Sequence, residues 1–187
     1  MNIRISRVSE GFRFFPYPPD YENGRTNNGG IDLVREPHRL DEITELSAVP
    51  SLRRIIADMR GPDSPFMTLG IEAGPRDEFF DGYLEFAFRD AALNTENNYR
   101  ELIGSFCDWV SREYPEFAES IGASFVAELQ HFHLHGIPHG DRVTLWFHTM
   151  NKEACDQLLR ILARFLLLIH PRPKKQAMQR AAGRSAC

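Results

Sequence analysis

The stretch YLEFAFRD, residues 83–90, alternates large apolar side chains with polar or small ones. Leu84, Phe86 and Phe88 therefore share one face of an extended chain, because successive side chains of a β-strand point to opposite sides of the sheet. The preceding stretch FMTLGIEAG, residues 66–74, alternates in the same way. Two alternating stretches joined by a Gly-containing link predict a β-hairpin with one buried face.

A helix is predicted after this hairpin, because apolar residues recur there at intervals of three and four positions. The stripe consists of Tyr99, Leu102, Ile103, Phe106, Trp109 and Val110. The same order of elements then returns, with alternation in residues 132–134 and 143–147 and an apolar helix that begins near Asn151, a good N-cap. A shift of 59 residues, which takes Leu84 to Val143, superposes the two patterns.

The predicted fold class is α+β, with duplicated ββα units that form a four-stranded, mainly antiparallel sheet and place two helices on one face. An additional N-terminal helix is predicted after Pro50, where apolar residues again recur at helical spacing. We expect three regions: an irregular segment over residues 1–39, a single α+β domain over residues 40–170, and a basic, disordered tail over residues 171–187.

The composition is that of an ordinary globular protein, with 187 residues, 42% apolar residues and a net charge of −4. No apolar stretch reaches the roughly 18 residues that a membrane span requires. The first residues lack the apolar centre of a signal peptide. Three cysteines without a C-x-x-C motif indicate neither a disulfide framework nor a thiolate zinc site. A cytoplasmic location is therefore expected.

Charge is unevenly distributed along the chain. Residues 171–187 contain five basic residues and no acidic one, so the rest has 17 basic against 26 acidic residues, a net charge of −9. An acidic surface repels phosphate backbones and attracts basic proteins. The charge pattern argues against nucleic-acid binding and favours a basic protein partner.

Residues 130–140, QHFHLHGIPHG, contain four histidines. With a turn over residues 136–141, Phe132 and Leu134 are expected beneath the helices together with the apolar residues of the next strand. Alternation then places three of the histidines on the opposite face of the sheet, beside polar and aromatic residues of the other strands. The candidate binding residues of this face are His131, His133, His135, His148, Trp146, Tyr83, Glu85 and Arg89.

Three interpretations of this face compete. It is a solvated sheet surface, which is the commonest fate of polar strand residues, or a recognition surface, or a metal site. In the third interpretation, His131 and His133 place two imidazoles about 6–7 Å apart on one strand. His148 or Glu85 would complete the set of ligands.

The sequence lacks the motifs of common catalytic sites, including G-x-x-x-x-G-K-[ST], G-x-S-x-G and H-E-x-x-H. Small, acidic α+β chains without such motifs are common among bacterial immunity and inhibitor proteins, which is an analogy of character and not of sequence. We therefore expect a non-enzymatic protein-binding module of inhibitor or immunity type, with no cofactor. The alternative is a metal-dependent enzyme or a small-molecule binder that uses the histidine-rich strand.

Overall fold

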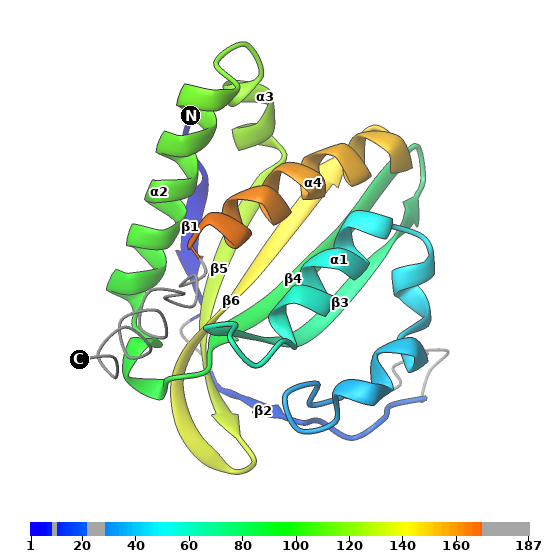
Figure 1. Ribbon diagram of the computed structural model, residues 1–187, viewed down its shortest axis with the longest axis vertical. Coiled ribbons are helices and arrows are strands. Elements are labelled where there is room, and N and C mark those ends of the chain that lie inside the picture. The colour runs from blue at the N-terminus through cyan, green and yellow to red at the C-terminus, as the bar shows by residue number, and fades with distance from the viewer. Residues whose placement is uncertain (9–10, 22–28, 170–187) are drawn as a thin grey trace, which may run out of the picture.

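The computed structural model describes residues 1–8, 11–21 and 29–169, and its fold is mixed α+β around one six-stranded sheet (Figure 1). The strands are β1 (Arg4–Arg7), β2 (Arg13–Phe15), β3 (Phe66–Arg76), β4 (Phe79–Phe88), β5 (Phe125–Leu134) and β6 (Ile137–Thr149). The helices are α1 (Pro50–Met59), α2 (Glu96–Glu113), α3 (Ala118–Ala123) and α4 (Lys152–Ile169), with short 3-10 turns η2 (Pro37–Glu42), η3 (Thr44–Ser47) and η4 (Ala91–Leu93). The tail predicted over residues 171–187 lies outside the described residues.

The sheet has the strand order β1-β5-β6-β4-β3, and β2 also pairs with β5. Strands β3 to β6 form its antiparallel part, whereas β1 and β2 pair with β5 in parallel. The predicted sheet of four strands is therefore too small. Residues 4–7 and 13–15, which were expected in an irregular segment, are strands because the exposed edge of β5 offers them backbone hydrogen-bond partners.

Helices α1, α2 and α4 cover one face of the sheet, which we call the helix face (Figure 1). The apolar stripe of α1 is buried as predicted, and so is that of α2 except for Leu102 and Trp109, which are partly buried. The buried stripe of α4 ends before Leu168 and Ile169, which are exposed in the last turn. From the sheet, this core includes Leu84, Phe86, Phe125, Ala127, Leu129, Val143, Leu145 and Phe147.

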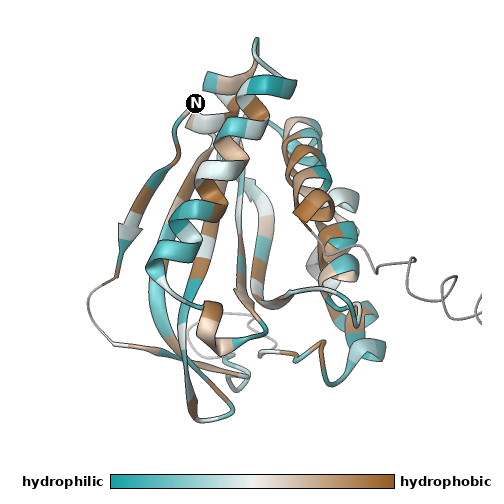
Figure 2. Cartoon of the chain, turned by 60° about the vertical axis from the view of Figure 1, so that its left-hand side comes forward, coloured by the Kyte–Doolittle hydropathy of each residue, from teal (hydrophilic) through white to brown (hydrophobic). Residues whose placement is uncertain are grey.

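Hydropathy varies around each helix, so that hydrophobic and hydrophilic segments alternate along the ribbons (Figure 2). This is the pattern of elements that bury one side and expose the other. Among the residues that the structure describes, no helix combines the length and the apolar character needed to cross a membrane.

Side-chain hydrogen bonds cap the N-termini of the two long helices, α2 and α4. The Thr95 hydroxyl accepts a hydrogen bond from the backbone N–H of Asn98 at 3.3 Å, at the start of α2. The Asn151 side-chain oxygen accepts one from the backbone N–H of Ala154 at 2.9 Å, at the start of α4. Such caps satisfy N–H groups that have no partner within the helix. The predicted start of the second helix near Asn151 is confirmed.

The hairpin of β5 and β6 turns at only two residues. His135 and Gly136 have φ angles of 51° and 81°, and Leu134 pairs with Ile137 across them. Two successive left-handed residues are typical of a tight hairpin turn. The predicted turn over residues 136–141 is wrong, because these residues belong mostly to β6.

A bulge between His131 and His133 reverses the predicted facing of β5, because the pairing skips one extra residue of β6 there. Leu129 pairs with Val143 and is fully buried in the core of the helix face. Phe132, predicted beneath the helices, lies on the opposite face of the sheet. Because side chains alternate along a strand, a shift of the register by one residue changes the face of every side chain.

We call the opposite side of the sheet the outer face, and one end of it carries a second, smaller apolar cluster. The cluster consists of Phe15, Met67, Leu69, Ala87 and Phe132, with Tyr17 and Leu134 partly buried against it. The segment around Phe15 covers this end, and Gly30 packs so closely that an added Cβ would lie 2.8 Å from the Phe15 ring. The N-terminal residues thus cover one part of the outer face.

Candidate functional site

The outer face also carries the polar and aromatic residues of the central strands β4 and β6. Tyr83 pairs with Trp146, and Asp81 pairs with His148. These pairs lie on the outer face because Leu84, the neighbour of Tyr83, belongs to the helix-face core. The structure therefore places Tyr83, Trp146 and His148 on one face, as the alternation predicts.

Trp146 is 41% exposed although it lies on a central strand. The centroid of its ring lies 5.0 Å from that of the Tyr83 ring, at an interplanar angle of 60°. The indole N–H donates a hydrogen bond to Glu128 at 3.2 Å. Burial, followed by the negative charge of Glu85, raises the pKa of Tyr83, so that its phenol is neutral at physiological pH. The two rings form an aromatic corner held in place by the sheet.

Asp81 and His148 form a second pair beside this corner. The imidazole Nδ1 lies 2.5 Å from the Asp81 carboxylate, and the ring packs against Phe79 with centroids 4.4 Å apart. The backbone N–H of His148 donates to the carbonyl of Ser124 at 3.0 Å, which connects β6 to the end of α3. These contacts orient an imidazole that is 57% exposed at its side chain.

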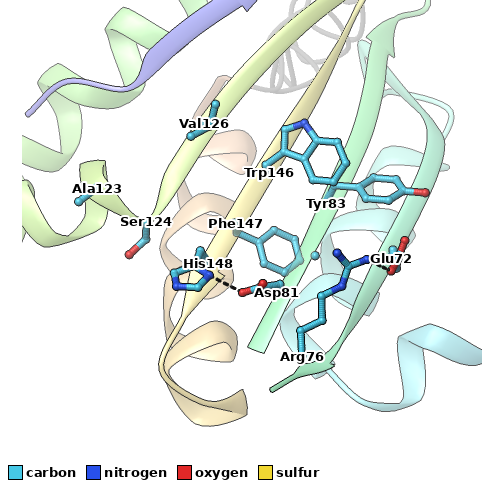
Figure 3. A pocket seen from close by; sticks show the side chains of 11 residues that line it. Glu72, Arg76, Asp81, Tyr83, Ala123, Ser124, Val126, Trp146, Phe147 and His148 are labelled. Carbon is cyan, nitrogen blue, oxygen red and sulfur yellow. Dashed lines mark hydrogen bonds and ion pairs between the residues drawn. The ribbon is translucent and has the colours of Figure 1, made fainter. Parts of the chain in front are cut away.

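A pocket of about 190 Å³ opens between the aromatic corner and the Asp81–His148 pair (Figure 3). Residues of β3, β4, β5 and β6 line it, together with Ala123 and Ser124 at the end of α3. Figure 3 shows the rings of Trp146 and Tyr83 side by side above the central strands. The pocket therefore combines an aromatic wall with titratable side chains.

Carboxylates outnumber cations around the pocket. Glu72 and Asp81 line it, and Glu128 lies beside the indole of Trp146. Arg76 donates to Glu72 at 2.8 Å, but both side chains are more than half exposed, and such pairs are weak. Among the residues that line the pocket and Glu128 beside it, three carboxylates therefore accompany one guanidinium, whereas Arg13 acts on Tyr83 from outside this lining.

Glu85, a predicted binding residue, instead belongs to a buried polar network. Its carboxylate forms an ion pair with Arg142, and the two side chains are 13% and 4% exposed. Arg142 also donates to Thr144 at 2.8 Å and to Gln130 at 2.7 Å. This network joins β4, β5 and β6, so its evident role is to hold the strands together.

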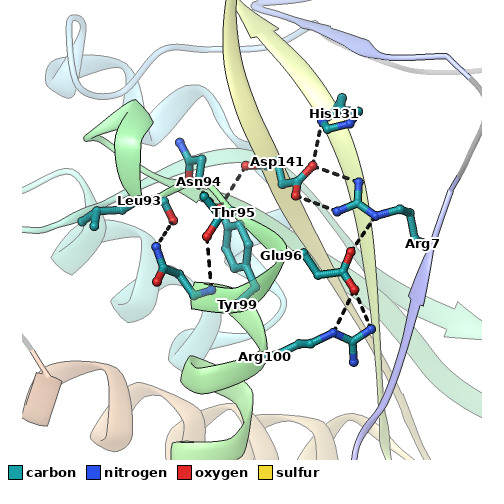
Figure 4. A network of polar contacts seen from close by, with 10 residues as sticks. Arg7, Leu93, Asn94, Thr95, Glu96, Tyr99, Arg100, His131 and Asp141 are labelled. Carbon is teal, nitrogen blue, oxygen red and sulfur yellow. Dashed lines mark hydrogen bonds and ion pairs between the residues drawn. The ribbon is translucent and has the colours of Figure 1, made fainter.

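His131 lies on the helix face, in contact with Asp141 at 2.8 Å (Figure 4). Arg7 of β1 donates to both carboxylate oxygens of Asp141, at 3.0 and 2.7 Å, and to Glu96 at 2.9 Å. Hydrogen bonding to Asp141 raises the pKa of the Arg7 guanidinium above its ordinary value. This network connects β1, β6 and α2.

Asn94, which is buried next to this network, connects it to the core. Its side chain accepts hydrogen bonds from the backbone N–H of Phe88 at 2.8 Å and from the Tyr99 hydroxyl at 2.7 Å, and it donates to the Phe88 carbonyl at 2.9 Å. The Asn94 carbonyl accepts from the N–H of Asp141 at 2.8 Å. One buried amide thus connects the end of β4 to α2.

The remaining predicted site residues lie in three other places. The ring of His133 stacks on that of Phe12 with centroids 4.1 Å apart. His135 occupies the hairpin turn, where its Nε2 lies 2.9 Å from Asp32. The guanidinium of Arg89 donates to four backbone carbonyls between the end of α1 and the start of β3, at 2.7 to 3.4 Å.

The histidines do not converge on one point. Within residues 1–8, 11–21 and 29–169, no group of three or more His, Cys, Asp or Glu side chains is placed to hold a metal ion. His131 lies on the helix face, whereas His148 and Glu85 lie on the outer face. The ligand set considered from the sequence is therefore divided between two sides of the sheet.

Some residues of this pocket could be predicted from the sequence, and others could not. Three of the eight predicted residues meet there, Tyr83, Trp146 and His148. Asp81 was missed, although the alternation of β4 places it on the same face as Tyr83. Glu128 could not be found, because the wrong facing of β5 assigned it to the helix side.

No protein-family model matches this chain, and neither the curated proteins nor the solved structures provide a match. What is established is the class, a mixed α+β protein with helices on one face of its sheet and a partly exposed outer face. The function is therefore inferred from the pocket and the charge around it.

Proposed function

We propose that this protein is a non-enzymatic, cytoplasmic binding module that recognises a basic protein partner through the exposed part of its outer face. One observation carries the proposal: Trp146 is 41% exposed at the middle of the sheet, beside Tyr83 and a pocket. Exposed tryptophan and tyrosine side chains on rigid elements contribute strongly to protein–protein interfaces.

The contrast between the two parts of the outer face supports this proposal. The segment with Phe15 and Tyr17 buries the apolar cluster at one end. At the other end, the described residues leave Trp146 and Phe79 exposed, at 41% and 38%. Burial of a large apolar side chain contributes about 1.5–3 kcal/mol, so a partner that covers this end would gain that free energy.

The charge of the chain supports a basic partner. The residues before position 171 have a net charge of −9, and carboxylates are in excess around the pocket. Opposite charges accelerate association and make its rate fall with salt. An inhibitor or immunity-type role, in which this chain blocks a basic protein, agrees with this charge and remains part of the proposal.

The substitution Trp146→Ala is expected to weaken binding to the partner about 30-fold or more, because a central aromatic anchor contributes at least about 2 kcal/mol. The partner is captured from cells of the source organism with the wild-type chain and then purified. Its dissociation constant is measured by isothermal titration calorimetry with the wild-type and variant proteins.

The matched control is Phe117→Ala, because Phe117 is 61% exposed and does not line the pocket. This variant is expected to bind as the wild type does. Equal losses in both variants would indicate non-specific apolar adhesion, and unchanged binding by the Trp146 variant would place the interface elsewhere. Either result would contradict the proposal.

The second candidate function is a metal-dependent enzyme or a small-molecule binder, which the Asp81–His148 pair at the pocket favours. Elemental analysis of the untagged protein distinguishes the two candidates. Our proposal expects no stoichiometric transition metal. One metal ion per chain that disappears in the His148→Ala variant would replace the proposal with the metal-dependent alternative.

We also propose that β3–β4–α2 and β5–β6–α4 are two copies of one ββα unit. A hairpin precedes a long helix in both. The second strands of the two hairpins, β4 and β6, pair with each other in the antiparallel sense. An arrangement of this kind is expected when two copies associate about an approximate two-fold axis.

A further inference from the structure

We infer that the pocket beside Trp146 receives an arginine side chain of the partner. This inference rests on the proposed function and adds the chemical group that the pocket recognises. It is supported by the size of the pocket, the nature of its walls and the charge around it, which are independent observations.

The size of the pocket suits a single side chain. Its volume is about 190 Å³. Pockets for drug-sized ligands and cofactors usually have volumes of about 300–1,000 Å³. The pocket is therefore too small for such a ligand, but a side chain anchored in a partner needs no more room than this.

The aromatic wall suits a planar cation. Trp146 exposes 41% of its surface, and the Tyr83 ring stands at 60° to it with centroids 5.0 Å apart. A guanidinium group stacks on an aromatic face and is attracted by its negative quadrupole. Because the indole N–H is already engaged by Glu128, the ring is held in position before the partner arrives.

The charge around the wall favours a cation over an anion. Glu72, Asp81 and Glu128 surround the aromatic corner. Of the cations, Arg76 lines the pocket and pairs with Glu72 in an exposed contact, and Arg13 acts on Tyr83 from outside the lining. Exposed pairs of this kind are weak, so an incoming guanidinium can compete for the Glu72 carboxylate. An acidic side chain in the pocket would instead meet three carboxylates.

Arginine fits this arrangement better than lysine does. Its planar group presents five N–H donors in a fixed fork and can stack on a ring while it donates to carboxylates at the ring edge. An ammonium group is a compact, strongly hydrated charge that loses more hydration in such a contact. The pocket therefore selects for arginine by shape as well as by charge.

The test uses nuclear magnetic resonance of the wild-type chain. The chain has two tryptophans, and the indole N–H signal of Trp146 is assigned by its loss in Trp146→Phe. The probes are peptides of equal length with repeats of Arg-Gly-Ser, Lys-Gly-Ser or Glu-Gly-Ser. The arginine peptide is expected to shift the Trp146 signal saturably, with an affinity about tenfold above that of the lysine peptide.

Two matched double variants separate the pocket from general charge. Glu72→Gln/Glu128→Gln is expected to weaken the arginine peptide about tenfold or more, and the amide carbonyl that it introduces at position 128 still accepts the indole hydrogen bond. Glu101→Gln/Glu113→Gln changes the net charge equally on the exposed surface of α2 and is expected to have little effect. Unchanged melting temperatures verify that both variants fold.

Equal affinity for arginine and lysine peptides, equal weakening by both double variants, or binding of the glutamate peptide would each overturn the inference. The two proposals can fail separately. If Trp146→Ala abolishes partner binding but the arginine peptide does not bind, the protein-binding function stands and the arginine site is wrong. If the arginine peptide binds but partner capture is insensitive to Trp146, the site stands and the proposed interface is wrong.

Discussion

Replacement of Phe147 by alanine is expected to lower the free energy of unfolding by about 3–5 kcal/mol, because it removes an enclosed aromatic ring and leaves a cavity. Phe147 is 2% exposed in the core of the helix face. Its ring lies so close to Gly82 that a Cβ at that position would be 2.6 Å from it, so little space surrounds the ring on that side. Urea unfolding followed by circular dichroism measures the change.

Phe117→Ala again provides the matched control, because the same side chain is removed from a position that is 61% exposed. Its expected cost is below about 1 kcal/mol, as for most surface substitutions. A loss below about 1 kcal/mol for Phe147→Ala would show that the core between the sheet and the helices is not packed as described.

Replacement of Asn94 by alanine is expected to cost about 3–5 kcal/mol, although it deletes only a small polar group. Asn94 is 3% exposed, and its side chain makes three hydrogen bonds, two with the backbone of Phe88 and one with the Tyr99 hydroxyl. Each buried polar group left without a partner costs about 1–3 kcal/mol. Thermal and urea unfolding of the variant measure the loss.

Asn97→Ala is the matched control for this prediction, because Asn97 is an exposed asparagine in α2 whose side chain contacts only Glu101 in the hydrogen bonds described. Its cost is expected to be below about 1 kcal/mol. Similar small losses in both variants would mean that water replaces the Asn94 side chain, and the amide would then not be a determinant of stability. Asn94→Asp would keep the two accepted hydrogen bonds but place a buried carboxylate oxygen against the Phe88 carbonyl, so it is expected to be no better than alanine.

Part of the site could be predicted from the sequence, and there is a physical reason why the rest could not. Tyr83, Trp146 and His148 lie on β4 and β6, where alternation alone assigns the face of each side chain. Asp81 follows from the same alternation. The pocket itself was not predictable, because it depends on Val126 and Ser124, which come from a strand and a helix end placed by long-range packing.

The error in β5 shows how one local feature changes a whole strand. His131 was expected on the outer face and Phe132 beneath the helices, but each lies on the other side. The bulge between His131 and His133 causes this reversal, because the two-residue turn at His135 and Gly136 alone would keep Phe132 on the same face as Val143. A bulge of this kind has no clear signal in the local sequence, so the pattern of apolar residues could not reveal it.

Elements whose signal is local could be predicted from the amino-acid sequence alone. The spacing of apolar residues predicts α1, α2 and α4, and the alternation around Leu84, Phe86 and Phe88 predicts the hairpin of β3 and β4 and its buried face. These periodicities follow from helix and strand geometry, so no distant residue is needed to interpret them. The mixed α+β class follows from the same local patterns.

Which residues meet in space depends on the tertiary structure. The pairing of β1 and β2 with β5, the covering of one end of the outer face by Phe15, and the Arg7–Asp141 contact join residues more than 50 positions apart. Their free energies depend on register and on loop conformation, which the pattern of apolar residues leaves open. For the same reason His131 and His148 lie on opposite faces and His135 lies in a turn, while Trp146 lies exposed beside a pocket that four strands line.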